Sequence, residues 1–497
     1  MHPWTKVVAA FAAIAITFFS AGCSFHSTKD RSHYLKVGSS AAPLSMDPTT
    51  TNAAAISEAL LYNVYETLVK IDEHGQLRGL LAKSYEISED RTRYRFVLND
   101  ATFTTGKEVT SHDVIASFER ILNDPHILPV HKKKMSVVSS MEAEDNKTVL
   151  IVLNHPSNSW FYALSQPMGI IFDPSTFDDL TVHPVGSGPY RFDQWIKGAS
   201  LSLERNEQYW ATPVDIEGVT FKYYSDPNAE NTAMLSGGLD VMTNVVIPQA
   251  IDQFDSDRFT IIDGVTNGEI VMGMNHDSEP LKDRKVRQAI LYGIDKVAMR
   301  QAVWAGYGQL IGSMVPPTDP WYEDLNERYP YDPDRARRLL KEAGYDRLQL
   351  RMRVPTVPYG PSAAAYMASQ LRSIGIDLIV DELEFPATWV NTVMKRSDYD
   401  LTIIAHVEPR DMPQFADPQY YWHYDNEDFQ ELIAQADRGN DSEQIDAYRQ
   451  AARILADDAA AGFLWILPRI VVTTPQVSGI QTDAPSLSFD LTSVSMR

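Results

Sequence analysis

The chain has 497 residues, of which 44% are hydrophobic, and its formal net charge at pH 7 is −22. A surface this acidic argues against nucleic acid or an anionic membrane as the binding partner, because both carry dense negative charge. The single cysteine excludes an intramolecular disulfide, so the stability of the protein must come from a large hydrophobic core. The length favours about two to four domains.

A hydrophobic run, residues 7–19, follows Lys6 near the start of the chain. The run is too short to cross a hydrocarbon core of about 30 Å and is typical of a signal peptide. Small residues then lead directly to Cys23, as in the lipobox of bacterial lipoproteins, although Ser20 stands where those proteins usually carry an aliphatic residue. We predict a signal peptide over residues 1–22, lipidation of Cys23, and a polar tether over residues 23–33.

The first clear strand and helix lie between residues 94 and 122. Hydrophobic side chains alternate along residues 94–98, which predicts a strand. Residues 110–122 carry hydrophobic side chains at helical spacing, and Thr110 or Ser111 can cap the helix that this spacing predicts.

Residues 332–407 give the clearest pattern in the chain. Asp332 and Pro333 predict the start of a helix, and Gly344 predicts its end. Three strands follow with a helix between each pair. The expected strands are 348–354, 376–384 and 399–407, and the expected helices are 362–374 and 386–395. This alternation predicts a parallel sheet with right-handed crossovers in an α/β protein.

The loops at the carboxyl ends of these strands are the predicted site, because ligands of parallel sheets bind there. Residues 355–362 form one such loop, and residues 407–415, which are rich in proline and charge, form the other. The second loop is the better candidate for a pocket. In the alternative interpretation, its charged residues pair only with one another in solvent.

The standard catalytic and metal-binding motifs are absent from the sequence. It contains no G-x-S-x-G, no H-E-x-x-H and no phosphate-binding G-x-x-x-x-G-K-[ST]. His126 and His131 are poorly spaced for zinc, and no further cysteine or histidine accompanies them. These absences favour a binding protein without a cofactor over an enzyme. Catalytic groups scattered through the chain would leave no motif, so a secreted hydrolase stays an alternative.

Five segments, taken in this order, resemble the extracellular solute-binding proteins of family 5, and the resemblance extends from about Tyr34 to the end of the chain. The segments are Tyr65–Ile121, Gly186–Trp210, LSGGLDV, DRKVRQAILYGIDK and YDPDRARRLLKEAGY. The resemblance implies an α/β fold like that of type II periplasmic binding proteins, two-lobed, with an extra inserted domain. Of the three domains so implied, domain I comprises residues 34–65, 185–270 and 471–497, domain II residues 66–184, and domain III residues 271–470. Chain crossings near Ile270 and Ile470 would form the hinge.

The resemblance also implies which residues bind the ligand. Peptide-binding members commonly hold the ligand ammonium with an aspartate in a loop that corresponds to residues 407–415. Here the pattern differs, because a histidine stands near the usual tryptophan position, and several carboxylates compete for the role of the aspartate. The candidate residues are His406, Glu408, Arg410, Asp411 and Asp417, with Arg410 meeting either a ligand anion or a neighbouring carboxylate. Asn275 either contacts the ligand or braces a strand end.

The resemblance implies an exported, monomeric lipoprotein on the outer face of the cytoplasmic membrane. It would capture peptides between two lobes and deliver them to the permease and ATPase of an ABC importer. Other solutes remain open, namely a nickel chelate, haem, a glutathione-like peptide or a sugar. A lipoprotein that presents a peptide to a signalling partner is a further alternative.

Overall fold

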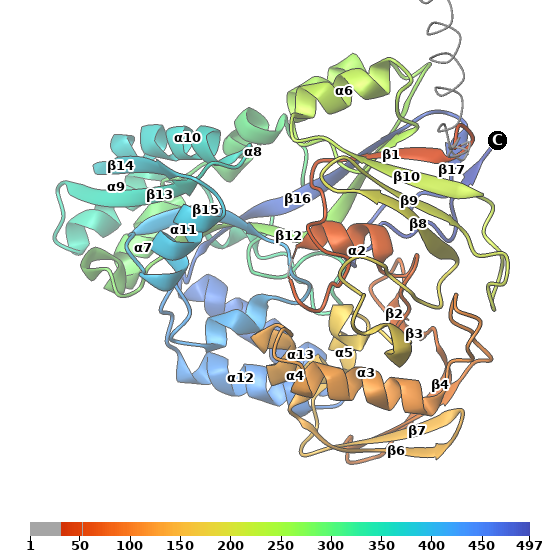
Figure 1. Ribbon diagram of the computed structural model, residues 1–497. Coiled ribbons are helices and arrows are strands. Elements are labelled where there is room, and N and C mark those ends of the chain that lie inside the picture. Colours follow the sequence, from red (N-terminus) through yellow and green to blue (C-terminus); the bar gives the residue numbers. More distant parts are fainter. Residues whose placement is uncertain (1–30, 52) are drawn as a thin grey trace, which may run out of the picture. The chain divides into compact units, whose positions relative to one another are not determined.

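Two long neighbouring strands, β12 (Thr260–Met274) and β16 (Gly462–Thr473), cross the centre of the computed structural model (Figure 1). The structure describes residues 31–51 and 53–497, so Cys23 and the predicted signal peptide lie outside it. Within these ranges, no helix is both long and apolar enough to span a membrane. The chain divides into units after Tyr34, and the fold described below is that of residues 35–497.

A ten-stranded sheet contains both long strands, in the order β14-β13-β15-β12-β16-β11-β1-β10-β9-β8. The remaining strands of this sheet are β1 (Leu35–Ser39), β8 (Tyr190–Ile196), β9 (Ser200–Arg205), β10 (Gly218–Tyr223), β11 (Val241–Met242), β13 (Leu348–Pro355), β14 (Ile376–Leu383) and β15 (Leu401–His406). β12 pairs with β15 in its second half, and β16 pairs with β11 at its end. The two long strands therefore join the two ends of the sheet.

The predicted parallel unit is confirmed at one end of the sheet. β13 pairs in parallel with β14 on one side and with β15 on the other. α10 (Gly360–Ser373) connects β13 to β14, and α11 (Ala387–Trp389) with the π-helical residues Val390–Lys395 connects β14 to β15. Leu401–Ile404 are buried, as predicted for a strand covered on both faces.

Helices cover both faces of this end of the sheet. Hydrophobic residues of α7 (Arg284–Tyr292), α8 (Lys296–Trp304), α9 (Pro333–Glu342) and α10 form one core with the strands. α12 (Glu427–Arg438) and α13 (Asp441–Asp457) form a second, aromatic-rich core on the opposite face. The carboxyl end of β15 is consequently held between two packed layers.

The caps explain why the predicted helices begin where they do. Thr110 and Asp113 form a capping box at the start of α3 (Ser111–Asn123). Asp332 accepts a hydrogen bond from the Arg335 amide at the start of α9, and Gly344, with a φ of +91°, follows the end of that helix. Both predicted helices are confirmed.

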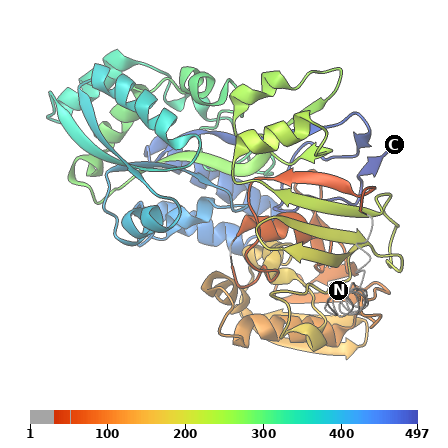
Figure 2. The same cartoon turned by 45° about the horizontal axis from the view of Figure 1, so that its top comes forward.

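A separate four-stranded sheet lies between residues 82 and 153, in the order β4-β5-β7-β6. Its strands are β4 (Ala82–Ile87), β5 (Arg93–Leu98), β6 (Val138–Asp145) and β7 (Thr148–Leu153). The predicted strand at 94–98 is β5, in which Tyr94, Phe96 and Leu98 are buried. α3 lies alongside this sheet (Figures 1 and 2). The domain boundaries remain a prediction, with this small sheet inside the range proposed for domain II.

Polar contacts join α5 (Asn158–Ala163) to the carboxyl end of α12. Asp437 accepts hydrogen bonds from the Ser157 hydroxyl at 3.0 Å and from the Ser159 amide at 2.7 Å. The Asn158 side chain donates to the carbonyls of Ala436 and Gly439, both at 2.9 Å. These bonds connect the segment that carries the small sheet with the segment that carries the parallel unit.

Candidate functional site

His406, the last residue of β15, lies between an acid and a phenol. Its Nδ1 is 2.7 Å from Oδ2 of Asp411, and its Nε2 is 2.9 Å from the hydroxyl of Tyr421. A carboxylate only accepts, so Nδ1 donates to Asp411 and Nε2 of a neutral ring accepts from Tyr421. The imidazole is nearly parallel to the Tyr421 ring, at an interplanar angle of 6°. The ring and the Asp411 carboxylate are therefore fixed in orientation.

Arg410 reaches from the same loop to aromatic and acidic partners. Its backbone is left-handed, with a φ of +58°. The guanidinium carbon lies 3.7 Å from the ring centroid of Tyr162 in α5 and 4.8 Å from that of Trp321. Nε is 3.8 Å from Oδ1 of Asp319 and is buried without a hydrogen-bond partner. Arg410 thus bridges the loop after β15 and helix α5.

Two buried carboxyl groups, Glu269 and Asp319, lie close to these residues. Glu269 is directly opposite His406 in the pairing of β12 with β15, and it has no exposed surface. In the described part of the chain, its side-chain oxygens have no hydrogen-bond partner other than its own backbone amide. Burial raises the pKa of Glu269 well above its ordinary value, and the charges of Asp411 and Asp319 add to the effect. Burial raises the pKa of Asp319 to about 6, although Arg410 opposes this shift.

Glu408 lies at the solvent side of the loop. Its side chain is exposed, yet surrounding atoms exclude part of its water, and this raises its pKa together with the charge of Asp411. Lys134 on α4 (Pro129–Met135) is close enough to act in the opposite direction. We use the name strand-end cluster for His406, Glu408, Arg410 and Asp411 together with Glu269 and Asp319.

The structure does not bring Asp417 and Asn275 to the strand-end cluster. Asp417 is exposed, follows the 3-10 helix Met412–Ala416, and accepts a hydrogen bond from the Gln419 amide. Asn275 follows the end of β12 that pairs with Leu401, whereas Glu269 pairs with His406 at the other end of β15. Four of the six predicted binding residues are therefore neighbours, and two lie elsewhere.

Asn275 has the role of a brace in this structure. Its Nδ2 donates to the carbonyls of Ser397 and Tyr399, at 3.1 and 2.9 Å, and its Oδ1 accepts from the Asp277 amide at 3.0 Å. These bonds occupy both ends of the amide. Of the two interpretations considered from the sequence, the hydrogen bonds favour strand-end bracing.

Three members of the site, Glu269, Asp319 and Tyr421, were missed by the sequence analysis. Glu269 could have been identified as a candidate from the sequence, because it is an ionisable residue that directly precedes a hydrophobic run, IVMGM, in a strand. Asp319 and Tyr421 come from loops far from β12 in the sequence, and no local pattern marks them.

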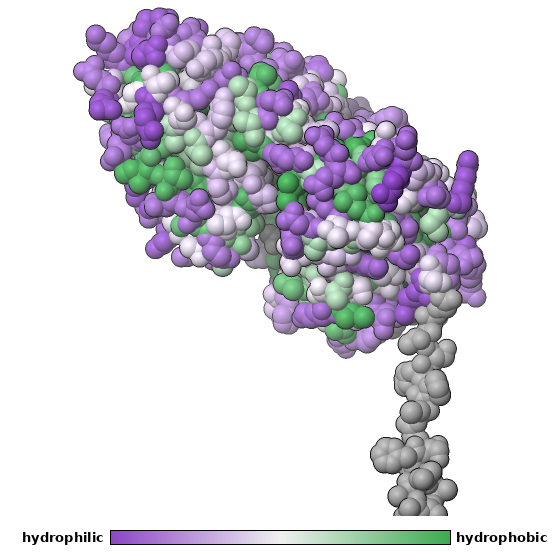
Figure 3. All heavy atoms as spheres, turned by 90° about the horizontal axis from the view of Figure 1, so that it is seen from above, coloured by the Kyte–Doolittle hydropathy of each residue, from purple (hydrophilic) through white to green (hydrophobic). Residues whose placement is uncertain are grey.

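An open recess is lined in part by Thr318 and by Val265 of β12. It has a volume of about 760 Å³, within the range of small-molecule sites. The lining residues are Glu73, His74, Asp263, Gly264, Val265, Arg300, Gly306, Gly308, Gln309, Pro317, Thr318 and Asp483. Thr318 directly precedes Asp319 of the cluster in the sequence. In the space-filling view of Figure 3, hydrophilic side chains predominate on the face seen, which is hollowed near its middle.

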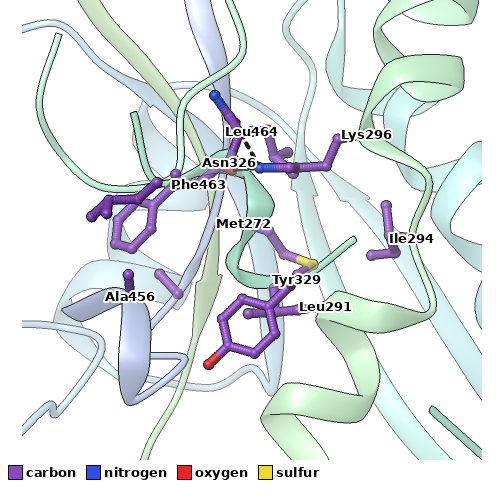
Figure 4. Close-up of a pocket in the computed structure, with 12 residues that line it drawn as sticks. Met272, Leu291, Ile294, Lys296, Asn326, Tyr329, Ala456, Phe463 and Leu464 are labelled. Carbon is purple, nitrogen blue, oxygen red and sulfur yellow. Dashed lines mark hydrogen bonds between the residues drawn. The ribbon is translucent and has the colours of Figure 1, made fainter. Parts of the chain in front are cut away.

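A second, smaller cavity surrounds Lys296 (Figure 4). Its volume is about 30 Å³, which leaves room for very few water molecules. The Lys296 ammonium donates to Asn326 and to the carbonyls of Ile311 and Phe463, and burial lowers its pKa to about 8. The lysine is fully hydrogen-bonded, so this cavity is a poor candidate for a solute site.

The strand-end cluster does not have the features of a hydrolytic centre. Tyr421 is the hydroxyl group beside His406, and burial together with nearby tyrosines and Asp411 raises its pKa. An activated nucleophile needs the opposite shift. Over residues 31–51 and 53–497, no group of acidic, histidine or cysteine side chains has the arrangement of a metal site. The geometry favours binding of a solute.

Comparisons with known proteins agree on a family. Residues 76–428 match the family model described as bacterial extracellular solute-binding proteins, family 5. The glutathione-binding protein GsiB of Shigella dysenteriae is 28% identical over 339 residues, which are 66% of this chain and 64% of that protein. The chain thus matches slightly less than two thirds of the length of this relative.

Solved structures extend the likeness to the whole fold. The periplasmic binding protein AgaA of A. tumefacien R10, in complex with agropinic acid, is 23% identical with a TM-score of 0.78, covering 93% of this chain and 99% of that one. DppA of Helicobacter pylori, in complex with peptide STSA, is 22% identical with a TM-score of 0.77, covering 93% and 98%. These likenesses confirm the predicted fold class, α/β and of the two-lobed type II periplasmic binding protein kind.

Replacing Asn275 by alanine should lower the free energy of unfolding by about 1–3 kcal/mol, because a buried carbonyl, that of Tyr399, and a half-buried one, that of Ser397, lose their donor. Urea denaturation should show a lower midpoint at an unchanged slope. Asn228→Ala, at an exposed position, is the matched control and should change the unfolding free energy by less than about 0.5 kcal/mol. Full stability with loss of solute binding would instead assign Asn275 to the ligand.

Proposed function

Because the chain belongs to the bacterial extracellular solute-binding proteins of family 5, we propose that it is the substrate receptor of an ABC importer and that its cargo is peptide. The observation that carries the proposal is the buried carboxylate of Asp411, held by His406 at the carboxyl end of β15. A peptide ammonium needs such a carboxylate, and ligands of α/β sheets gather at strand ends.

Named relatives support a peptide cargo and add other small solutes to the candidates. GsiB is named for glutathione, and the DppA structure contains a peptide, whereas the AgaA structure contains agropinic acid. A related scaffold therefore accommodates both peptides and other small organic ions. The second candidate is accordingly a receptor for a non-peptide solute, such as a nickel chelate, haem or a sugar.

Closure about a hinge is the proposed means of capture. β12 and β16 run between the two ends of the large sheet, and β12 has irregular pairing between Val265 and Glu269, where a strand can bend. The contact of Arg410 with Tyr162 and the hydrogen bonds of Asp437 with the start of α5 would form when the two lobes meet. A solute that touches both lobes then favours the closed state by its differential affinity for that state.

The remaining parts of the proposal concern location and delivery. Lipidation of Cys23 would anchor the receptor on the outer face of the cytoplasmic membrane, through the tether over residues 23–33. A diacylglyceryl group, which carries two acyl chains, together with a third, amide-linked chain gives stable anchoring where a single chain does not. The closed monomer would present its surface to the permease, and the associated ATPase would drive import.

The receptor function is tested by identifying what the purified protein retains. Mass spectrometry of material released by denaturation should find a small solute, peptide being expected, and X-ray scattering should show compaction when this solute is added back. The solute should be recovered chemically unchanged. Product formation that disappears when a carboxylate of the strand-end cluster is removed would establish a hydrolase instead. Uptake that is unaffected by deletion of the protein would favour a signalling lipoprotein.

Asp411→Asn should weaken binding of a free-amino alanine tripeptide by about tenfold to a hundredfold, the range expected when an ion-paired hydrogen bond is lost. Asp417→Asn should change the affinity by less than about twofold, because Asp417 is exposed and caps a turn away from the cluster. Isothermal titration calorimetry measures both.

The N-acetylated tripeptide is the control for this comparison. It lacks the ammonium, so wild type and Asp411→Asn should bind it equally, and a general distortion of the His406 region would weaken it as well. Equal affinities of wild type and Asp411→Asn for the free-amino peptide would refute the role of Asp411.

Lipidation is tested by growth with labelled palmitate. The wild-type protein should carry the label, and Cys23→Ser should not, because the chain has no other cysteine. Absence of label from the wild-type protein would leave an unanchored receptor.

A further inference from the structure

The strand-end cluster contains more carboxyl groups than cations. Glu269, Asp319, Glu408 and Asp411 supply four carboxyl groups, and Arg410 is its only permanent cation. Lys134 reaches only the outer carboxylate, Glu408, and His406 is already bonded to Asp411 and Tyr421. Buried carboxyl groups are normally balanced by donors or cations. The carboxyl groups of Glu269, Asp319 and Asp411, taken together, have fewer donors and cations than such balance requires.

Glu66 is a buried carboxyl group whose oxygens are hydrogen-bonded within the fold, and it serves as a comparison for Glu269. Like Glu269, Glu66 is almost fully buried, at 1% exposure against 0%. Its two oxygens accept hydrogen bonds from Ser187 at 2.7 Å, Tyr209 at 2.8 Å and Trp210 at 2.9 Å. Apart from its own backbone amide, no group within residues 31–51 and 53–497 is a hydrogen-bond partner of the Glu269 oxygens. The contrast separates a carboxyl group that is satisfied within the fold from one that is not.

The position of Glu269 relates it to the ligand site. It lies on β12, directly opposite His406, and the charges of Asp411 and Asp319 act on its pKa. Those two acids contact His406 and Arg410 respectively. Glu269 therefore belongs to the same cluster as the carboxylate proposed to bind a peptide ammonium, and it is the more buried of the two.

We propose that Glu269 is the acceptor for a basic side chain of the cargo, so that the receptor selects peptides containing lysine or arginine. This inference rests on the proposed receptor function and narrows it to a class of ligand. A cationic group would supply donors to both oxygens of Glu269 and would favour the ionised form of this carboxyl group, which burial and the neighbouring acids Asp319 and Asp411 disfavour.

A long basic side chain suits the surroundings of Glu269. The same face of the sheet carries an aromatic-rich core that includes Trp321, Phe415 and Tyr448. The methylene stem of lysine or arginine packs on such surfaces while its charged end reaches a polar group. Glu269 has no exposed surface while Arg410 stacks on Tyr162. The side chain would therefore enter in the open state, before that stacking forms.

An anionic or neutral side chain would fit less well. An anion at Glu269 would face three carboxyl groups, and a neutral group would leave the negative charge uncompensated. Like-charge contacts at a buried site act as a filter against the wrong ligand. The cluster should therefore discriminate by charge more than by shape.

The test compares peptides that differ only in one charge. Alanine tripeptides with lysine at each position in turn are titrated into the full-length protein, each beside the same peptide with norleucine, in which a methyl group replaces the ammonium. At one position at least, the lysine peptide should bind about tenfold more tightly than its norleucine counterpart. Norleucine peptides that bind as tightly as lysine peptides at every position would overturn the inference and leave the receptor function intact.

Two variants assign the preference to one residue. Glu269→Gln should reduce the lysine preference to less than about twofold, with little change for norleucine peptides. Glu66→Gln removes a carboxyl group of similar burial that is hydrogen-bonded elsewhere, and it should keep the wild-type preference. A lysine preference that survives in Glu269→Gln would place the acceptor elsewhere and refute the assignment.

Failure of the inference about Glu269 can be distinguished from failure of the proposed receptor function. If no tripeptide binds and no solute is retained on purification, the receptor proposal itself fails. If Glu269→Gln does not fold, Glu269→Asp, which keeps the charge but shortens its reach, should lower the lysine preference about threefold or more. An undiminished preference in that variant would contradict direct contact.

Discussion

The pairing of β12 with β16 is the constraint on which the rest of the structure depends. The two strands are paired from Thr260 with Thr473 to Met272 with Gly462, and each continues into a different end of the ten-stranded sheet. β12 also sets the register of β15, so it determines that Glu269 and His406 are opposite each other. A one-residue change in that register would turn the Glu269 side chain to the other face of the sheet and remove it from the strand-end cluster.

The sequence predicted what depends on neighbouring residues. The cap at Asp332, the end at Gly344 and the alternation along β13 are local, and the structure has all of them. The loop after β15 was found for the same reason, because strand ends in a parallel unit follow from the order of elements. Its charged residues do meet, apart from Asp417, whose longer separation from β15 places it in a turn.

What the sequence could not predict depends on contacts between distant segments. The lack of partners at Glu269 follows from which side chains surround it, and these come from β15, the loop at Asp319 and the last long strand. The aromatic partner of Arg410 comes from α5, far away in the chain. Asn275 shows the same limit, because only the positions of the Ser397 and Tyr399 carbonyls distinguish a brace from a ligand contact.

The hydrogen bonds between α5 and α12 separate the strength with which a solute is captured from the choice of which solute is captured. Ser157, Asn158 and Asp437 belong to no part of the strand-end cluster, yet they connect the same two segments that Arg410 and Tyr162 connect. In a receptor that closes on its cargo, such bonds change the closed population and scale the apparent affinity for every ligand by one common factor. The strength of capture can therefore evolve on α12 while the choice of cargo stays with β12 and β15.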